Sequence, residues 1–182
     1  SCRCGAGSRN AMGAAASTKQ ASTTQHAAIT LLKKLDEKLI TKVAAGHILF
    51  LVGDFVRSGK LKLSDTRQEL EKRQARTGEK IFLAPEEAVA LLRDGNREVG
   101  ALTYGWSSPD HPDPDGHYMR AMVRALKHPL GAHIKAIFWD QMSLHQWPRT
   151  PAQDAGFKEG LGVMAYLYAS ATGTTVLRHK AL

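Results

Sequence analysis

The chain has 182 residues, of which 43% are hydrophobic, so it is long enough to bury the core of one domain and carry an extension. Its formal net charge is +8, yet it has no basic stripe interleaved with aromatic residues and no zinc-finger or RNA-binding motif, which argues against nucleic acid as a partner. No apolar run approaches the roughly 20 residues of a membrane-spanning helix, and Cys2 and Cys4 cannot form a disulfide framework for the body of the chain. These features predict a cytoplasmic protein.

Residues 1–24 are rich in small and polar side chains and offer little to bury, so we expect a disordered tail. Within it, Met12-Gly13 followed by Ser17 fits the myristoylation pattern, which makes Gly13 a lipidation candidate if translation begins at Met12. The alternative is a plain tail of small residues. An acylated N-terminus would bring the protein to a membrane surface as a peripheral protein, although one acyl chain binds only weakly.

The segment 25–80 is expected to form a helical N-terminal extension. Over 28–43 apolar residues recur at three- and four-residue steps, which predicts an amphipathic helix that packs on the domain or, alternatively, lies on an anionic membrane. The apolar run 47–55 is ambiguous between helix and strand, and we favour a helix. The charged run 65–76 predicts a solvated helix that ends at Gly78.

Residues 81–182 alternate between helical and extended patterns. We expect helices near 85–92, 117–127 and 151–171, and strands near 100–106, 134–140 and 174–177. Alternating strands and helices imply right-handed crossovers and a parallel sheet. Three strands make a thin sheet, and the last of them lies close to Leu182, so we expect the domain to be incomplete at its C-terminus.

The loop 110–116 carries three carboxylates and a histidine between prolines, a composition that raises the possibility of calcium binding. An EF-hand alignment fails, because it puts His111 at the first position and Met122 where a bidentate glutamate is required. We therefore predict no metal site here, but a rigid loop with Asp115 near the start of the next helix. A second metal hypothesis brings together Asp140, His145, His111 and His117.

The most informative stretch is the apolar run 137–139, which turns polar where the strand is expected to end. Carboxyl ends of parallel strands meet at one edge of a sheet, and ligands bind at that edge. The ligand-binding candidates are Trp106 and Ser107 after the first strand, and Asp140, Ser143, His145 and Gln146 after the second. One alternative is that Asp140 and Gln146 only fix the loop backbone with their carboxylate and amide. Another is a nucleophilic triad of the Asp-Ser-His type.

Three motifs of this chain, in order, resemble the fungal heterokaryon-incompatibility domain. Residues 101–106 read Ala-Leu-Thr-Tyr-Gly-Trp, where the family has Ala-Leu-Ser-Tyr-x-Trp-Gly. Residues 138–146 correspond to the family's Trp-Ile-Asp-x-x-Cys-Ile-Asn-Gln, and 164–171 to its Met-x-x-Ile-Tyr-x-x-Ala. The resemblance spans under half of the chain, roughly 99–177, and the Ser-Leu-x-Gln variant looks still closer to uncharacterised algal and protist proteins.

The chain also departs from that family pattern. Ser107 replaces a glycine, Ser143 a cysteine and His145 an asparagine, while Pro148-Arg149 stands where an acidic residue is expected. Only Asp140 and Gln146 carry over cleanly, so a role that depends on the cysteine or on the acidic residue does not transfer.

Heterokaryon-incompatibility domains are in turn similar to Toll/interleukin-1 receptor domains. The resemblance therefore implies a flavodoxin-like, three-layer α/β fold with a short parallel sheet. It also implies a signalling or interaction module in cell death or defence that associates with itself or with a protein partner. Some Toll-type domains cleave NAD, which would make NAD a substrate and Asp140 the candidate catalytic residue, because the glutamate they use lies on a helix that would follow Leu182. Whether the chain is an enzyme stays open, and no cofactor is predicted.

Overall fold

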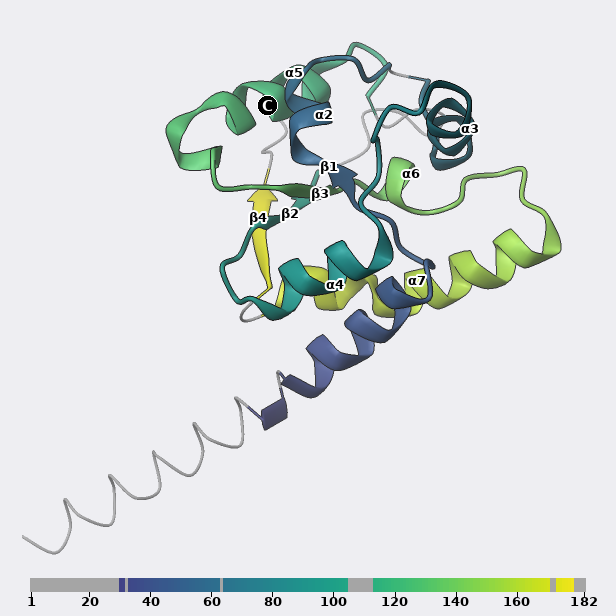
Figure 1. The fold of residues 1–182 in the computed structure, drawn as a ribbon, viewed down its shortest axis with the longest axis vertical. Helices are drawn as coiled ribbons and strands as arrows, with labels where there is room; N and C mark the ends of the chain where they lie inside the picture. The colour runs from purple at the N-terminus through teal and green to yellow at the C-terminus, as the bar shows by residue number, and fades with distance from the viewer. Residues whose placement is uncertain (1–29, 32, 63, 105–112, 171–172, 179–182) are drawn as a thin grey trace, which may run out of the picture.

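A computed structural model describes residues 30–31, 33–62, 64–104, 113–170 and 173–178. Its centre is an open four-stranded sheet in the order β1-β3-β2-β4, with helices on both faces (Figure 1). The strands are β1 (Leu51–Val52), β2 (Val99–Thr103), β3 (Ala136–Phe138) and β4 (Thr174–Arg178). Strand β2 is parallel to both β3 and β4, whereas β1 is antiparallel to β3.

The helices follow the predicted pattern closely. The described part of the first helix covers 30–31 and 33–44. The others are α2 (Gly53–Arg57), α3 (Arg67–Thr77), α4 (Pro85–Arg93), α5 (His117–Lys127), the 3-10 turn η1 (Pro129–Gly131), α6 (Asp140–Ser143) and α7 (Pro151–Ala169). Helix α3 ends at Gly78 in the left-handed conformation, as its sequence predicts. The helices and the sheet together confirm the mixed α/β class, and the pairing of β2 with β3 and β4 confirms the three parallel strands.

Two hydrophobic cores lie on opposite faces of the sheet. Ile137 of β3 belongs to the core under α2, α3 and α5, whereas its neighbours Ala136 and Phe138 belong to the core under the first helix, α4 and α7. This alternation follows from the period of two in a strand, and burial on both faces explains why β3 reads as a continuous apolar run. The result is a helix, sheet, helix layering (Figure 1).

The preference for a helix over the whole of 47–55 is wrong. Leu51 pairs with Ile137 in an antiparallel ladder, and the helix α2 begins only at Gly53. Gly53 donates its N–H to the Lys135 carbonyl at 2.7 Å, and a Cβ on it would lie 2.8 Å from the Ile134 carbonyl oxygen. Tertiary pairing with β3 therefore decides the conformation, and it adds a fourth strand to the three that were predicted.

Asp115 lies near the start of helix α5, as predicted, but the side chain that holds this helix end is that of Asp113. The carboxylate of Asp113, not Asp115, accepts hydrogen bonds from the N–H groups of Tyr118 (3.0 Å) and Met119 (2.9 Å). Asp113 is buried, while Asp115 is exposed. These bonds satisfy amides at the helix N-terminus, so this end of the loop 110–116 has a structural role.

Residues on both sides of position 80 contribute to both cores. Leu39 and Phe50 pack with Phe138 on one face, and Phe55 and Leu70 pack on the other. No helix in the described part of the chain is long and apolar enough to cross a membrane. The lipidation candidate Gly13 lies outside the described residues.

Candidate functional site

The carboxyl ends of β2 and β3 meet, as their parallel pairing requires. The Tyr104 hydroxyl, just after β2, donates to Oδ1 of Asp140 (2.9 Å), the first residue of α6 after β3. The same hydroxyl accepts a hydrogen bond from the indole N–H of Trp139 (2.8 Å). Tyr104 also packs on the rings of Trp139 and Tyr118. The edge predicted from the sequence is therefore a connected cluster.

The charge of Asp140 affects two tyrosines. Burial, reinforced by the Asp140 carboxylate, raises the pKa of Tyr104 far above its usual value. Burial and the same carboxylate raise the pKa of Tyr168, on α7, to about 12. The Tyr168 hydroxyl donates to the Leu102 carbonyl of β2 at 3.1 Å. Both tyrosines are thus protonated donors at neutral pH, and neither serves as a base there.

One carboxylate oxygen of Asp140 accepts hydrogen bonds within the protein, and the other has no partner among the described residues. Besides Tyr104, Oδ1 accepts the backbone N–H of Gln141 at 2.7 Å. No hydrogen bond between the described residues reaches Oδ2, and that atom is not among the buried unsatisfied ones. Asp140 is only partly buried. Its Oδ2 therefore has no hydrogen-bond partner among the described residues.

Ser143 and Gln146 hold the backbone around them. The Ser143 Oγ is fully buried and accepts the N–H of Trp139 at 3.0 Å. The side-chain amide of Gln146 donates to the carbonyls of Leu144 (2.9 Å) and Asp140 (3.3 Å). The Gln146 contacts support the structural alternative for that residue, and Ser143 also has a structural role. These contacts also remove the Asp-Ser-His triad, because its nucleophile would have no access to a substrate.

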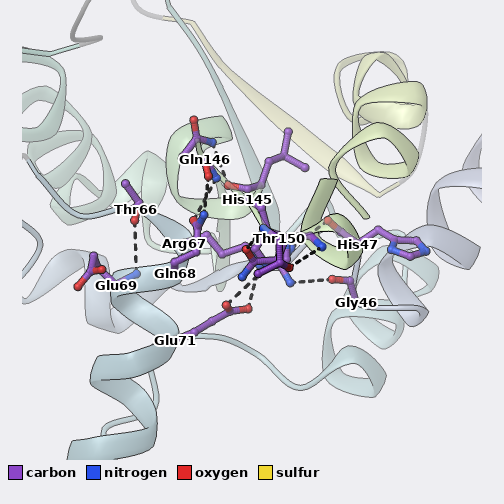
Figure 2. Close-up of polar contacts among 12 residues, drawn as sticks. Gly46, His47, Thr66, Arg67, Gln68, Glu69, Glu71, His145, Gln146 and Thr150 are labelled. Carbon is purple, nitrogen blue, oxygen red and sulfur yellow. Dashed lines mark hydrogen bonds and ion pairs between the residues drawn. The ribbon is translucent and has the colours of Figure 1, made fainter. Parts of the chain in front are cut away.

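Arg67, at the start of α3, is the residue that sequence reasoning missed. It is only 4% exposed, and its guanidinium donates to three carbonyls, those of Gly46 (2.8 Å), His47 (3.0 Å) and Ser143 (3.3 Å) (Figure 2). It also pairs with Glu71 at 2.9 Å. Burial lowers the pKa of Arg67, and Glu71 opposes this shift. Nothing in the charged run 65–76 distinguished this arginine from its exposed neighbours.

The ring of His145 points into the same cluster as Arg67 (Figure 2). Its Nε2 lies 3.7 Å from Oε2 of Glu71, and its side chain is 13% exposed. Burial, then Arg67, lowers the pKa of His145, Arg149 acts in the same direction, and Glu71 opposes both. His145 therefore belongs to an ionic cluster between α3 and the loop that joins α6 to α7.

The loop between α6 and α7 is braced on both sides and exposes a tryptophan. Gln68 of α3 accepts the Gln146 N–H at 3.0 Å and donates to the Gln146 carbonyl at 2.5 Å (Figure 2). Arg149 stacks on Phe157 of α7, 3.9 Å from the ring centre, and it also lies over the ring of Trp147. Trp147 itself is 80% exposed. A side chain as exposed as this one does not pack into the core.

Neither metal hypothesis gains support within the described residues, where no group of three or more metal-ligating side chains converges. Asp113, one of the loop carboxylates, caps α5 instead. His111, Trp106 and Ser107 lie outside the described residues, so their place at the edge of the sheet stays a prediction.

Comparison with known proteins adds no relative. No protein-family model, no curated protein and no solved structure matches the chain. The resemblance to heterokaryon-incompatibility and Toll/interleukin-1 receptor domains therefore stays a prediction from the three sequence motifs.

Proposed function

We propose that this chain is a signalling or interaction module of the heterokaryon-incompatibility or Toll/interleukin-1 receptor kind, which associates with itself or with a protein partner. One observation carries the proposal. The loop between α6 and α7 is held by contacts with α3 and α7, and its Trp147 side chain is 80% exposed. A tryptophan that solvent surrounds on a rigid loop is the kind of residue that anchors protein interfaces. The strand order supports the fold, because β2 lies between the two parallel strands that follow it, as the first strand does in flavodoxin-like sheets.

Analytical ultracentrifugation of the full chain over a range of concentrations tests this role. We expect the average mass to rise with concentration in the parent, and to stay at the monomer value in Trp147→Ala. Leu130→Ala is the matched control, because Leu130 is equally exposed (81%) but lies on η1. A parent that stays monomeric, or a Trp147→Ala protein that associates like the parent, would contradict self-association through this loop.

The alternative function is NAD hydrolysis, and it is favoured by Oδ2 of Asp140, which has no hydrogen-bond partner among the described residues at the edge of the sheet. A carboxylate beside the ribose supports the positive charge that develops as the nicotinamide bond breaks. If this alternative holds, the full chain releases nicotinamide from NAD, and Asp140→Ala abolishes the release while the folded state persists by circular dichroism. Absence of release from the parent would remove the enzymatic alternative and leave the interaction role in place.

A further inference from the structure

A hollow of about 360 Å³ lies at the surface beside α5, next to the end of α2. Met119 and Val123 give it an apolar lining, and Arg120 and Arg124, one helical turn apart, lie beside them. Gly59, which has a φ of +72°, leaves the side towards α2 open, since a Cβ there would meet nothing within 4 Å. The hollow therefore combines an apolar surface with two neighbouring guanidinium groups.

The charges on this surface have no acidic counterpart within the described residues. Helix α5 contains Arg120, Arg124 and Lys127 and no acidic residue. All three are exposed, and none takes part in an ion pair between described residues. Arg120 donates to the backbone carbonyl of Asp115, an uncharged acceptor that does not neutralise the guanidinium.

A second hollow on the other flank of α5 also combines an apolar lining with a neighbouring arginine. It has a volume of about 70 Å³, is lined by Ala121, Ala125 and Leu177, and is bordered by the exposed Arg178 of β4. Arg178 also lacks an ion-pair partner among the described residues. The outer surface of α5 thus alternates between cationic and apolar positions.

This alternation fits a protein segment better than a membrane or a nucleic acid. The large apolar residues of α5, Tyr118, Met122 and Leu126, are buried in the core, so the helix has no wide apolar face to insert into lipid. The hollow beside α2 has no aromatic ring on which a base could stack. Arginine binds carboxylates through paired hydrogen bonds, and methionine adapts to varied apolar shapes.

We propose that the hollow lined by α5 and by Gly59, which follows α2, is a docking site for an acidic, amphipathic peptide segment of a partner protein. Arg120 and Arg124 would bind its carboxylates, while Met119 and Val123 receive one of its apolar side chains. This inference rests on the proposed interaction role and deepens it by naming the chemistry of the partner. Its surface lies on α5, apart from the loop that carries Trp147, so the two can fail separately.

Fluorescence anisotropy with a labelled peptide that repeats the unit Glu-Leu-Leu-Glu tests the docking site on the full chain. We expect saturable binding that weakens with salt, and a loss of at least about tenfold in affinity for Arg120→Glu/Arg124→Glu. The control, Lys33→Glu/Lys34→Glu, changes the net charge equally on the first helix, where both lysines are exposed, and should keep the parent affinity. Arg120→Gln/Arg124→Gln, with folding checked by circular dichroism, repeats the test without introducing acidic side chains.

Three results would overturn the proposal. The first is equal weakening in the α5 variant and the Lys33/Lys34 control, which would mean attraction by overall charge alone. The second is equal binding of a peptide in which Gln replaces every Glu. The third is preferential binding of phosphatidylserine vesicles or duplex DNA with the same arginine dependence, which would assign the surface to a lipid or a nucleic acid. A failure in this assay, with concentration-dependent association through Trp147 intact, would leave the interaction role standing.

Discussion

His145 illustrates how a single side chain can couple proton binding to the packing of the sheet edge. Its Nδ1 is buried, and no described residue forms a hydrogen bond with it. The groups that face the ring are Arg67 and Glu71 from α3 and Arg149 from its own loop. Burial is the main reason why the folded state favours the neutral ring, and a charged imidazole would also lie near two guanidinium groups with one carboxylate in compensation.

This environment predicts a loss of stability in mild acid. The pKa of His145 is lowered in the folded protein, so the unfolded chain, with a histidine pKa near 6.5, binds the proton first as the pH falls. The free energy of unfolding should therefore be highest above about pH 6.5 and decrease below it. Urea unfolding between about pH 5 and 7 measures this slope, and His145→Gln should flatten it. An unchanged slope in that variant would assign the effect to other groups.

The residue scale also shows the limit of sequence reasoning for the site. Asp140 and Gln146 could be located from the sequence because a buried strand followed by polar side chains marks the edge of a parallel sheet. Arg67 could not, because its partners outside α3 are backbone carbonyls from two distant segments, and a carbonyl is present at every position. The exposure of Trp147 could not be predicted either, since a tryptophan next to a proline is compatible with burial.

At the scale of elements, helix α7 shows why small residues recur on one of its faces. Gly160 packs so closely on the preceding segments that a Cβ would lie 2.7 Å from Cδ2 of Leu144 and 3.1 Å from the His47 carbonyl oxygen. Gly162, two residues on, is exposed, and a Cβ there would meet nothing. A glycine at position 160 therefore lets α7 approach Leu144 and His47 closely.

Two alanine substitutions in α7 should consequently have opposite effects. Gly162→Ala should raise the free energy of unfolding by about 0.5–1 kcal/mol, because alanine favours the helix. Gly160→Ala gains the same propensity, but its methyl group must displace Leu144 and the backbone at His47, so we expect a net loss of about 1 kcal/mol. Urea denaturation of both variants provides the comparison. Stabilisation of similar size by both would show that α7 does not pack tightly at Gly160.

Some elements can be predicted from the sequence more easily than others. Helices such as α5 and α7 are long enough for their apolar period and end signals to be read, and their bounds lie close to the predicted ones. Strand β1 has only two residues, too few for any period, and its conformation depends on a partner strand far along the chain. Pairing of this kind is determined by the tertiary fold and has no local signature.

On the scale of the whole molecule, residues before and after position 80 share one sheet and two hydrophobic cores. The sheet takes its antiparallel edge strand from residues before that position and its three parallel strands from residues after it. Both cores combine side chains from the two segments. The sequence placed the parallel strands in a common layer because their helices alternate with them. It gave no sign that the expected extension completes the sheet.

The buried guanidinium of Arg67 has a consequence for local opening motions. Helix α3 cannot move away by small steps, because its departure would remove a hydrogen-bond donor from the carbonyls of Gly46, His47 and Ser143 at the same moment. The amide of Leu49, which shares the Ser143 carbonyl with Arg67, would then become accessible to solvent deuterium only when this whole corner comes apart. One side chain thereby turns a set of separate contacts into a single cooperative unit.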